Sequence, residues 1–236
     1  MEKIQEYKLK IIEIIDEIDN VKTFRLKIPE GSDLKYRCGQ FFMVRFEDNE
    51  TLKRAYSISS SPENKSYMEI TLDLVGEFTT KLFKCKVGDY LMFKGPYGKF
   101  YFSEDMKQNL VLIGGGLGIT PLRSIINFCK DKNLDNNVKL LYSSRTPEHV
   151  VYRKELEKLN EWEKFDYIQT ITRPKPEDGW SGKTGRIDES MIKENVENFE
   201  DNLYFLCGPL EFVKEIISIL EKLGVKKEQI KADAWG

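Results

Sequence analysis

The sequence has 236 residues, of which 40% are hydrophobic and 32% charged, and its formal net charge is -2. These values are typical of a water-soluble globular chain long enough for two small domains. Basic residues are scattered and matched by acids, which argues against a nucleic-acid partner. The four cysteines lie too far apart for a CxxC motif, so we expect neither a zinc site nor an iron–sulfur cluster.

No stretch approaches the roughly 20 apolar residues that a membrane-spanning helix needs. The N-terminal residues also lack the apolar segment of a secretory signal. We therefore expect a cytoplasmic protein with no membrane span and with reduced thiols. We further expect a monomer or a weak oligomer.

The first part of the chain shows the period-two alternation of β-strands. The alternation is clearest in residues 68–74, MEITLDL, where apolar side chains are expected to face a core and Glu69 and Thr71 to face water. Turn residues separate further predicted strands at 7–15, 21–28, 41–46, 56–59 and 90–94. Several short strands at this spacing predict an antiparallel Greek-key β-barrel, closed or nearly closed, in residues 1–104.

Beyond residue 103 the pattern changes to alternating strands and helices. Short apolar runs predict strands at 110–113, 138–142, 167–172 and 203–206, and apolar residues at helical spacing follow several of them. The last predicted helix ends at Gly224, because glycine is favoured just past a helix end. This pattern predicts a doubly wound parallel α/β nucleotide-binding domain in residues 105–236.

A glycine-rich turn, GGGLGITP in residues 114–121, joins the first of these strands to a helix. Glycines let the backbone approach a phosphate, and a helix N-terminus favours negative charge. The alternative is a tight turn without a ligand. The turn departs from the common dinucleotide fingerprint, because Ile119 holds the third glycine position and no acid follows the next strand. An ordinary NAD dehydrogenase is therefore disfavoured.

A second informative stretch, RAYSISS in residues 54–60, places a cation, an aromatic ring and hydroxyls at alternating spacing on a strand. Together with the glycine-rich turn, this pattern indicates two nucleotides held side by side, as hydride transfer between a flavin and a nicotinamide requires. The sole histidine, His149, is interpreted as a surface residue, and nothing in the sequence supports a nucleophilic triad.

Five short motifs occur in a fixed order along the chain. They are Arg54-x-Tyr56-Ser57, GEFTTKL at 76–82, GPYG at 95–98, GGxGITP at 115–121 and CGP at 207–209. Each motif alone is weak, but the ordered set spans nearly the whole chain and is specific. The set resembles the ferredoxin–NADP reductase superfamily, in the form of a single-chain flavin-dependent NAD(P)H oxidoreductase without an iron–sulfur domain.

The resemblance implies roles in flavin binding for residues of the first domain. In this reading Arg54 holds a flavin phosphate, Tyr56 packs on the isoalloxazine and Ser57 bonds near the reactive N5, with Ala55 between them. A second flavin loop contains Gly76, Phe78, Thr79 and Thr80, although this run could equally be the first turn of a helix. Tyr97 could stack on an adenine, which favours FAD over FMN.

The resemblance also implies a nicotinamide site in the second domain. The pyrophosphate would meet the helix that follows the glycine turn, through Gly115, Gly116, Gly118, Thr120 and Pro121. Cys207, with Gly208 and Pro209, would lie against the nicotinamide, and the alternative is a purely structural cysteine. Trp235 would cover the outer face of the flavin, and the alternative there is a frayed tail. Ser57, Cys207 and Trp235 are thus the candidate catalytic residues.

Two strand ends suggest a preference for NADPH over NADH. Arg145 follows the second predicted strand of this domain, and Thr172-Arg173 follows the third. The latter resembles the Ser-Arg pair that binds the 2′-phosphate in NADPH-using relatives, and cations in residues 180–186 could close over it. The alternative is that Arg173 is an ordinary solvated charge.

The leading functional hypothesis is an FAD-dependent oxidoreductase. It would move a hydride from NAD(P)H to flavin N5 and pass electrons to, or reversibly from, a ferredoxin- or flavodoxin-type carrier. One alternative is an electron-transfer subunit of a larger complex, although the iron–sulfur version is disfavoured because only one cysteine lies beyond residue 200. Others are a free-flavin or small-molecule reductase, and a nucleotide-binding module without activity.

Overall fold

The structure is a computed structural model that describes residues 3–235. The chain divides into two compact units. One contains the residues up to Ser103 together with Arg123–Asn133, and the other contains Glu104–Leu122 and the residues from Leu134 onwards. The expected domain division between residues 104 and 105 stays a proposal, because helix α2 (Ile119–Asp131) begins in the second unit and continues into the first.

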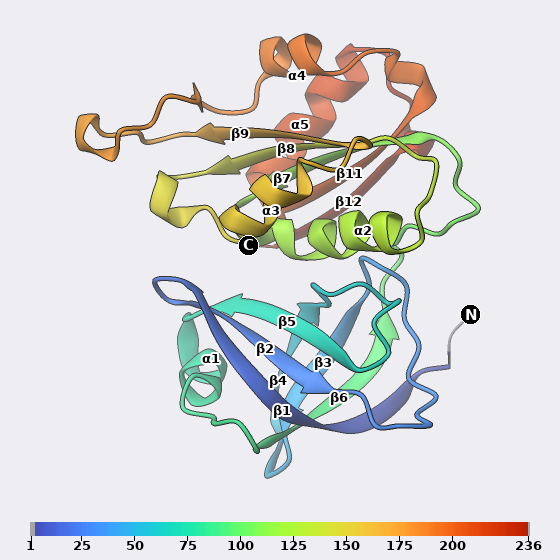
Figure 1. The fold of residues 1–236 in the computed structure, drawn as a ribbon, viewed down its shortest axis with the longest axis vertical. Helices are drawn as coiled ribbons and strands as arrows, with labels where there is room; N and C mark the ends of the chain where they lie inside the picture. Colours follow the sequence, from blue (N-terminus) through green and yellow to red (C-terminus); the bar gives the residue numbers. More distant parts are fainter. Residues whose placement is uncertain (1–2, 236) are drawn as a thin grey trace. The chain divides into compact units, whose positions relative to one another are not determined.

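The first unit is built on a six-stranded antiparallel sheet (Figure 1). Its strands are β1 (Gln5–Ile18), β2 (Val21–Lys27), β3 (Phe41–Phe46), β4 (Asn49–Ser57), β5 (Tyr67–Asp73) and β6 (Tyr90–Tyr97). The order β4-β3-β6-β1-β2-β5 is not sequential, and a bridge between Ile58 and Ile70 joins the two edges. The predicted Greek-key barrel is therefore confirmed.

The barrel encloses a core of apolar side chains that point inward from every strand. Phe24, Phe42 and Phe93 are completely buried, and burying each such ring stabilises the fold by about 1.5–3 kcal/mol. The short helix α1 (Gly76–Leu82) follows β5 and seals one part of this core. Its Phe78 ring lies 5.0 Å from that of Phe46, centroid to centroid.

Two strands of the barrel differ from the sequence-based expectation. The expectation that Glu69 and Thr71 face water is wrong, since the structure buries both side chains. β4 begins at Asn49 rather than near residue 56, because pairing with β3 supplies the hydrogen bonds that its polar residues do not predict. The same pairing places Ser57, the last residue of β4, opposite Phe41.

The second unit is a six-stranded parallel sheet with helices on both faces (Figure 1). Its strands, in the order β10-β9-β8-β7-β11-β12, are β7 (Asn109–Gly115), β8 (Val138–Ser144), β9 (Phe165–Ile171), β10 (Lys183–Thr184), β11 (Asn202–Pro209) and β12 (Ile230–Trp235). Helices α4 (Glu189–Asn195) and α5 (Leu210–Lys222) cover one face, and α3 (Arg153–Leu159) lies on the other. The predicted doubly wound domain is confirmed, with β10 and β12 as strands that the sequence did not reveal.

The strand order reverses direction at β7, which pairs with β8 on one side and with β11 on the other. In doubly wound sheets, ligands bind beyond the carboxyl ends of the strands at such a reversal. A ligand is therefore expected at the carboxyl ends of β7 and β11. Within residues 3–235, no helix combines the length and the apolar character needed to cross a membrane.

Candidate functional site

The end of strand β4 presents Arg54, Tyr56 and Ser57. Arg54 is exposed, its Nη1 donates to the carbonyl of Lys53 at 2.8 Å, and it forms no ion pair with any residue that the structure describes. Tyr56 is half-buried, and burial raises the pKa of its phenol. Ser57 is half-buried, and its hydroxyl makes no hydrogen bond within residues 3–235. The end of β4 therefore presents a guanidinium without an ion pair, an aromatic ring and a hydroxyl without a hydrogen bond among the described residues.

Helix α1 lies beside this strand end. The rings of Tyr56 and Phe78 are 5.7 Å apart between centroids. The Thr79 hydroxyl donates to Val75 O at 2.6 Å, and the Thr80 hydroxyl donates to Gly76 O at 2.8 Å. The GEFTTKL run is thus a helix whose threonine hydroxyls donate to its own backbone. The flavin-loop and the helix interpretations of the sequence both refer to this helix.

Gly76 and Tyr97 complete the set of flavin candidates in the first unit. Gly76 has φ +76°, a conformation that favours glycine, and a side chain there would meet no atom within 4 Å. Tyr97 ends β6 and stacks on Phe41, with 5.7 Å between ring centroids. Because Phe41 is also the register partner of Ser57, the Tyr97 ring lies one strand away from the β4 end.

In the second unit, the turn after β7 depends on glycine at two positions for different reasons. A Cβ on Gly118 would come within 1.9 Å of the carbonyl oxygen of Cys207, so only glycine allows the turn to pack on β11. Gly116 is exposed with φ +56°, and a Cβ there would meet nothing within 4 Å. The Thr120 hydroxyl closes the turn by donating to Leu117 O at 2.9 Å. The turn therefore packs closely on β11 at Gly118 and is open at Gly116.

The Cys207-Gly208-Pro209 segment lies at the same sheet edge, because Cys207 is the register partner of Gly114. The Phe212 ring packs beneath both backbones: a Cβ on Gly115 would lie 3.2 Å from it and one on Gly208 2.8 Å. The Cys207 side chain is buried, and burial raises the pKa of its thiol well above the ordinary value. Cys207 is therefore a neutral thiol, suited to packing rather than to nucleophilic attack.

The ends of β8 and β9 bring Arg145 and Arg173 together. Arg173 N donates to Arg145 O at 2.8 Å, and Thr172 N donates to Ser144 O at 2.9 Å. Both arginines are exposed, and neither guanidinium has a carboxylate partner in the described part of the chain. Two guanidinium groups without a carboxylate partner among the described residues thus start from adjacent strand ends, and each is a donor suited to phosphate oxygens.

The cations expected from residues 180–186 are engaged elsewhere. Lys183 pairs with Glu194 at 2.9 Å, and Arg186 pairs with Glu215 at 3.3 Å. The Trp180 indole N–H donates to Lys183 O at 2.9 Å. These contacts attach residues 180–186 to other parts of the second unit.

The remaining candidates lie at the surface. Trp235 is 44% exposed at the end of β12, and the neighbouring Gly236 lies outside the described residues. His149 is exposed beside Thr146, whose hydroxyl lies 2.7 Å from His149 Nδ1, as expected of a surface residue. Among the described residues no cluster of histidine, cysteine and carboxylate side chains could hold a metal.

Comparison with known protein families indicates which ligands suit the end of β4 and the carboxyl ends of β7 and β11. Residues 8–102 match the oxidoreductase FAD-binding domain family, and residues 112–217 match the oxidoreductase NAD-binding domain family. The chain belongs to the ferredoxin–NADP reductase superfamily. It accordingly contains an oxidoreductase FAD-binding domain followed by an oxidoreductase NAD-binding domain.

Similar proteins include components of larger systems. One, from Marinomonas sp. (strain MWYL1), is named as a subunit of a Na(+)-translocating NADH-quinone reductase and is 30% identical over 263 residues. The alignment covers 92% of this chain and 64% of that protein. The chain thus spans slightly less than two thirds of the length of this relative.

Among solved structures, the ferredoxin reductase in carbazole 1,9a-dioxygenase is 26% identical with a TM-score of 0.85, over 99% of this chain and 70% of the other. A ferredoxin NADP+ reductase from Neisseria gonorrhoeae with bound FAD and NADP shares the fold, with a TM-score of 0.83 at 22% identity. That alignment covers 98% of this chain and 99% of the other.

The residues present fit both FAD and a nicotinamide dinucleotide. For FAD, the β4 end offers the unpaired Arg54 fork and the free Ser57 hydroxyl, and both are donors to anionic or carbonyl oxygens. For the dinucleotide, the open space over Gly116 leaves room for a pyrophosphate at the start of a helix. This fit comes from the donors and the space that the structure shows in each unit taken by itself.

Sequence reasoning missed two residues at the carboxyl ends of β7 and β11. Asp233 is the register partner of Cys207, and its pKa is raised mainly by burial. The alternation of residues 230–235, IKADAW, could have revealed the strand that places it there. Phe212 supports both glycine segments, and no sequence signal distinguished it from the other apolar residues of its helix.

Proposed function

We propose that this protein takes a hydride from NADPH onto flavin N5 and passes electrons to a separate ferredoxin- or flavodoxin-type carrier. The observation that carries the proposal is the distribution of unpaired arginines. Arg54 in the first unit, and Arg145 and Arg173 in the second, have no carboxylate partner among the described residues.

Other arginines of the chain form ion pairs with carboxylates. They are Arg25, Arg45, Arg123, Arg153 and Arg186, while Arg37 lies over the Tyr101 ring, 4.5 Å from its centroid. An arginine fork binds phosphate through two parallel charge-assisted hydrogen bonds, so a fork without a protein acid is suited to an anionic ligand. The three unpaired forks lie at the β4 end and at the β8 and β9 ends, where the two nucleotides are expected.

The bound flavin supplies the chemistry that links a two-electron hydride donor to one-electron acceptors. The chain supplies binding and orientation. We propose that Arg54 binds an FAD phosphate, that Tyr56 packs on the ring system and that Ser57 donates a hydrogen bond to it. The neutral Cys207 thiol would pack against the nicotinamide, and Trp235 would shield the flavin until the nicotinamide enters.

The preference for NADPH rests on the paired strand ends. The Arg173 N–H and Arg145 carbonyl are joined by a hydrogen bond, so both guanidinium groups start from neighbouring backbone positions. The Thr172 hydroxyl, which donates to Ser144 O at 3.3 Å, adds a polar group next to Arg173 in the sequence. We propose that Arg145, Thr172 and Arg173 bind the 2′-phosphate. We also propose that no carboxylate among the described residues binds the ribose at these strand ends.

The test is anaerobic reduction of the purified protein by NADPH and by NADH in a stopped-flow spectrophotometer. Bleaching of the flavin absorbance by NADPH, at a rate exceeding that with NADH, is the expected result. Reoxidation by ferredoxin, flavodoxin, quinone and free flavin would then identify the acceptor class. A colourless protein that reconstitutes with no flavin would overturn the proposal.

A second candidate function is an electron-transfer subunit of a larger complex. The relatives named as subunits of a Na(+)-translocating NADH-quinone reductase favour it, and this chain spans 64% of the Marinomonas protein. Fast reduction by NAD(P)H combined with slow reoxidation by every soluble carrier would support this alternative. A cytoplasmic location and a monomeric or weakly oligomeric state remain proposals that go with the first function.

A further inference from the structure

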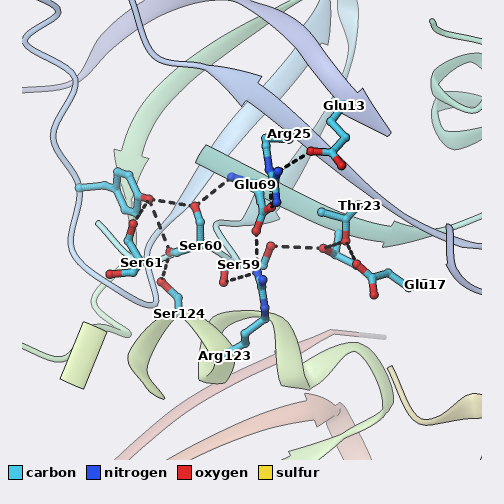
Figure 2. Close-up of polar contacts among 12 residues, drawn as sticks. Glu13, Glu17, Thr23, Arg25, Ser59, Ser60, Ser61, Glu69, Arg123 and Ser124 are labelled. Atoms are coloured by element: carbon cyan, nitrogen blue, oxygen red, sulfur yellow. Dashed lines mark hydrogen bonds and ion pairs between the residues drawn. The ribbon is translucent and has the colours of Figure 1, made fainter. Parts of the chain in front are cut away.

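A buried carboxylate occupies the middle of the first unit. The side chain of Glu69, on β5, is 2% exposed, and both of its oxygens accept from arginines. Arg25 Nη2 lies 2.7 Å from Oε1, and Arg123 Nη1 lies 2.7 Å from Oε2 (Figure 2). A buried charge is unfavourable unless it is paired and hydrogen-bonded, so these two cations are a condition for placing Glu69 there.

The same carboxylate system holds the backbone of Ser59. Arg123 Nη1 also donates to Ser59 O at 3.0 Å, and Ser59 N donates to Glu69 O at 2.9 Å. The Ser59 hydroxyl lies 3.2 Å from that of Thr71 (Figure 2). Every polar atom of Ser59 is therefore engaged by Glu69, by its arginine partner or by the neighbouring residue of β5.

The next two residues are held in the same way. Glu69 N donates to the Ser60 hydroxyl at 2.9 Å, and Ser124 Oγ donates to Ser60 O at 2.6 Å. The buried Tyr36 hydroxyl donates to Ser61 O at 3.1 Å. Residues 59–61 thus form a buried segment whose path is fixed by side chains far away in the sequence.

This segment continues directly from the strand end assigned to FAD. Ser57 ends β4, and Ser59 follows two residues later. The strand end is half-buried or exposed, whereas Ile58, Ser59 and Ser60 are buried. The free Ser57 hydroxyl has no hydrogen bond to hold it among the described residues, so its position follows from the backbone beyond it.

We infer that Glu69 is a positioning residue for the FAD site and acts through Arg123 on Ser59 to fix the direction of the β4 end. The inference rests on the proposed contact of Ser57 with the flavin. In this inference, the buried Glu69–Arg123 pair positions Tyr56 and Ser57 against the isoalloxazine. Arg25 neutralises the other carboxylate oxygen, and its hydrogen bonds go to Glu69 and Glu13 rather than to residues 59–61.

The chain offers a matched control for this inference. Glu13 also pairs with Arg25, but its side chain is 48% exposed and lies on the side of Arg25 away from Arg123 (Figure 2). Glu69→Gln and Glu13→Gln therefore remove the same charge from the same arginine. Only Glu69→Gln also removes the carboxylate that pairs with Arg123.

Arg123 provides a second, independent pair of variants. One nitrogen, Nη1, makes both the Glu69 and the Ser59 contacts, and a lysine ammonium can donate to two acceptors from one nitrogen. Arg123→Lys keeps the positive charge beside Glu69, whereas Arg123→Met removes it. This pair decides the question even if Glu69→Gln fails to fold.

The experiment measures the FAD dissociation constant by fluorescence titration and the visible circular dichroism of bound FAD, with thermal unfolding as a separate measurement. We expect Glu69→Gln and Arg123→Met to raise the dissociation constant about tenfold and to alter the visible dichroism. Glu13→Gln and Arg123→Lys should stay close to wild type in both. The double variant of Glu69 and Arg123 should be no worse than either single variant, since both act through one contact.

Two results would overturn the inference. One is a fall in thermal stability with unchanged FAD affinity and dichroism, which would leave the cluster with a purely structural role. The other is an equal effect of Glu13→Gln, which would trace the change to Arg25. If wild-type protein binds no FAD at all, the proposed function itself fails, so the two failures are distinguishable.

Discussion

Cys207 and Asp233 are register partners across β11 and β12. Burial raises the pKa of both groups, and the charge of Asp233 raises the pKa of the thiol further. Each ionised group therefore disfavours the other. Burial first, and the Asp233 charge second, therefore favour the neutral thiol at the sheet edge that the nicotinamide is proposed to occupy.

Cys207→Ala should leave the FAD content intact and slow reduction by the nicotinamide more than tenfold, or about 1.4 kcal/mol of barrier. The reason is that the buried thiol ends β11 in register with the glycine turn and would shape the nicotinamide pocket. Stopped-flow reduction measures the rate. Cys129→Ala removes another buried thiol with no assigned role and serves as control. An unchanged rate in Cys207→Ala would leave Cys207 a structural residue.

Arg54→Ala should lose FAD during purification. One charge-assisted phosphate contact is worth about 1.5–3 kcal/mol, which corresponds to a roughly ten- to hundredfold loss of affinity. The flavin-to-protein absorbance ratio after dialysis measures the occupancy. Arg45→Ala is the matched control, because Arg45 lies in the same barrel and pairs with Glu6. Full occupancy in dilute, dialysed Arg54→Ala would contradict the phosphate assignment.

Arg173→Ala should lower the ratio of kcat/KM for NADPH over NADH, because it removes a fork from the proposed 2′-phosphate site. Steady-state kinetics with both coenzymes measure this ratio. Arg186→Ala removes an arginine already paired with Glu215 and should leave the ratio unchanged. A wild-type preference for NADH, or an unaltered ratio in Arg173→Ala, would show that Arg173 does not read the phosphate.

Asp233→Asn should stabilise the protein at neutral pH. The pKa of Asp233 is raised in the folded state, so the folded protein holds this proton more tightly than the unfolded chain does. Stability is therefore lost as the pH rises from the ordinary value of 3.8 through the raised pKa, and the loss persists above it.

The measurement for this variant is thermal unfolding as a function of pH. Asp233→Asn should match wild type at about pH 3 and exceed it at about pH 7, because the amide is never ionised. Asp19→Asn, at an exposed turn, is the control and should show no such difference. A destabilised Asp233→Asn at neutral pH would show that the carboxylate makes a favourable contact there.

Glycine and apolar patterns predicted the scaffold well because they act locally. Most strands follow period-two or all-apolar runs, whereas the start of β4 and the edge strands β10 and β12 do not, and the need for glycine at 118 follows from the close approach of a turn to its neighbouring strand. Such constraints involve residues near in sequence or a backbone that must pass closely. They therefore leave a signal in the sequence itself.

Contacts between distant residues could not be predicted in this way. The alternation around Glu69 indicates a solvent-facing side chain, and the cation that covers it, Arg123, lies 54 positions further along the chain. Similarly, Lys183 and Arg186 appear free in the sequence because Glu194 and Glu215 reach them only after the helices fold back. Charge pairing over such separations depends on topology rather than on spacing.

The last rung of the ladder between β11 and β12 joins Trp235 to Pro209. Proline has no N–H, so Pro209 supplies no main-chain donor to either neighbouring strand. The partly exposed Trp235 therefore ends β12 opposite a residue that contributes no main-chain donor.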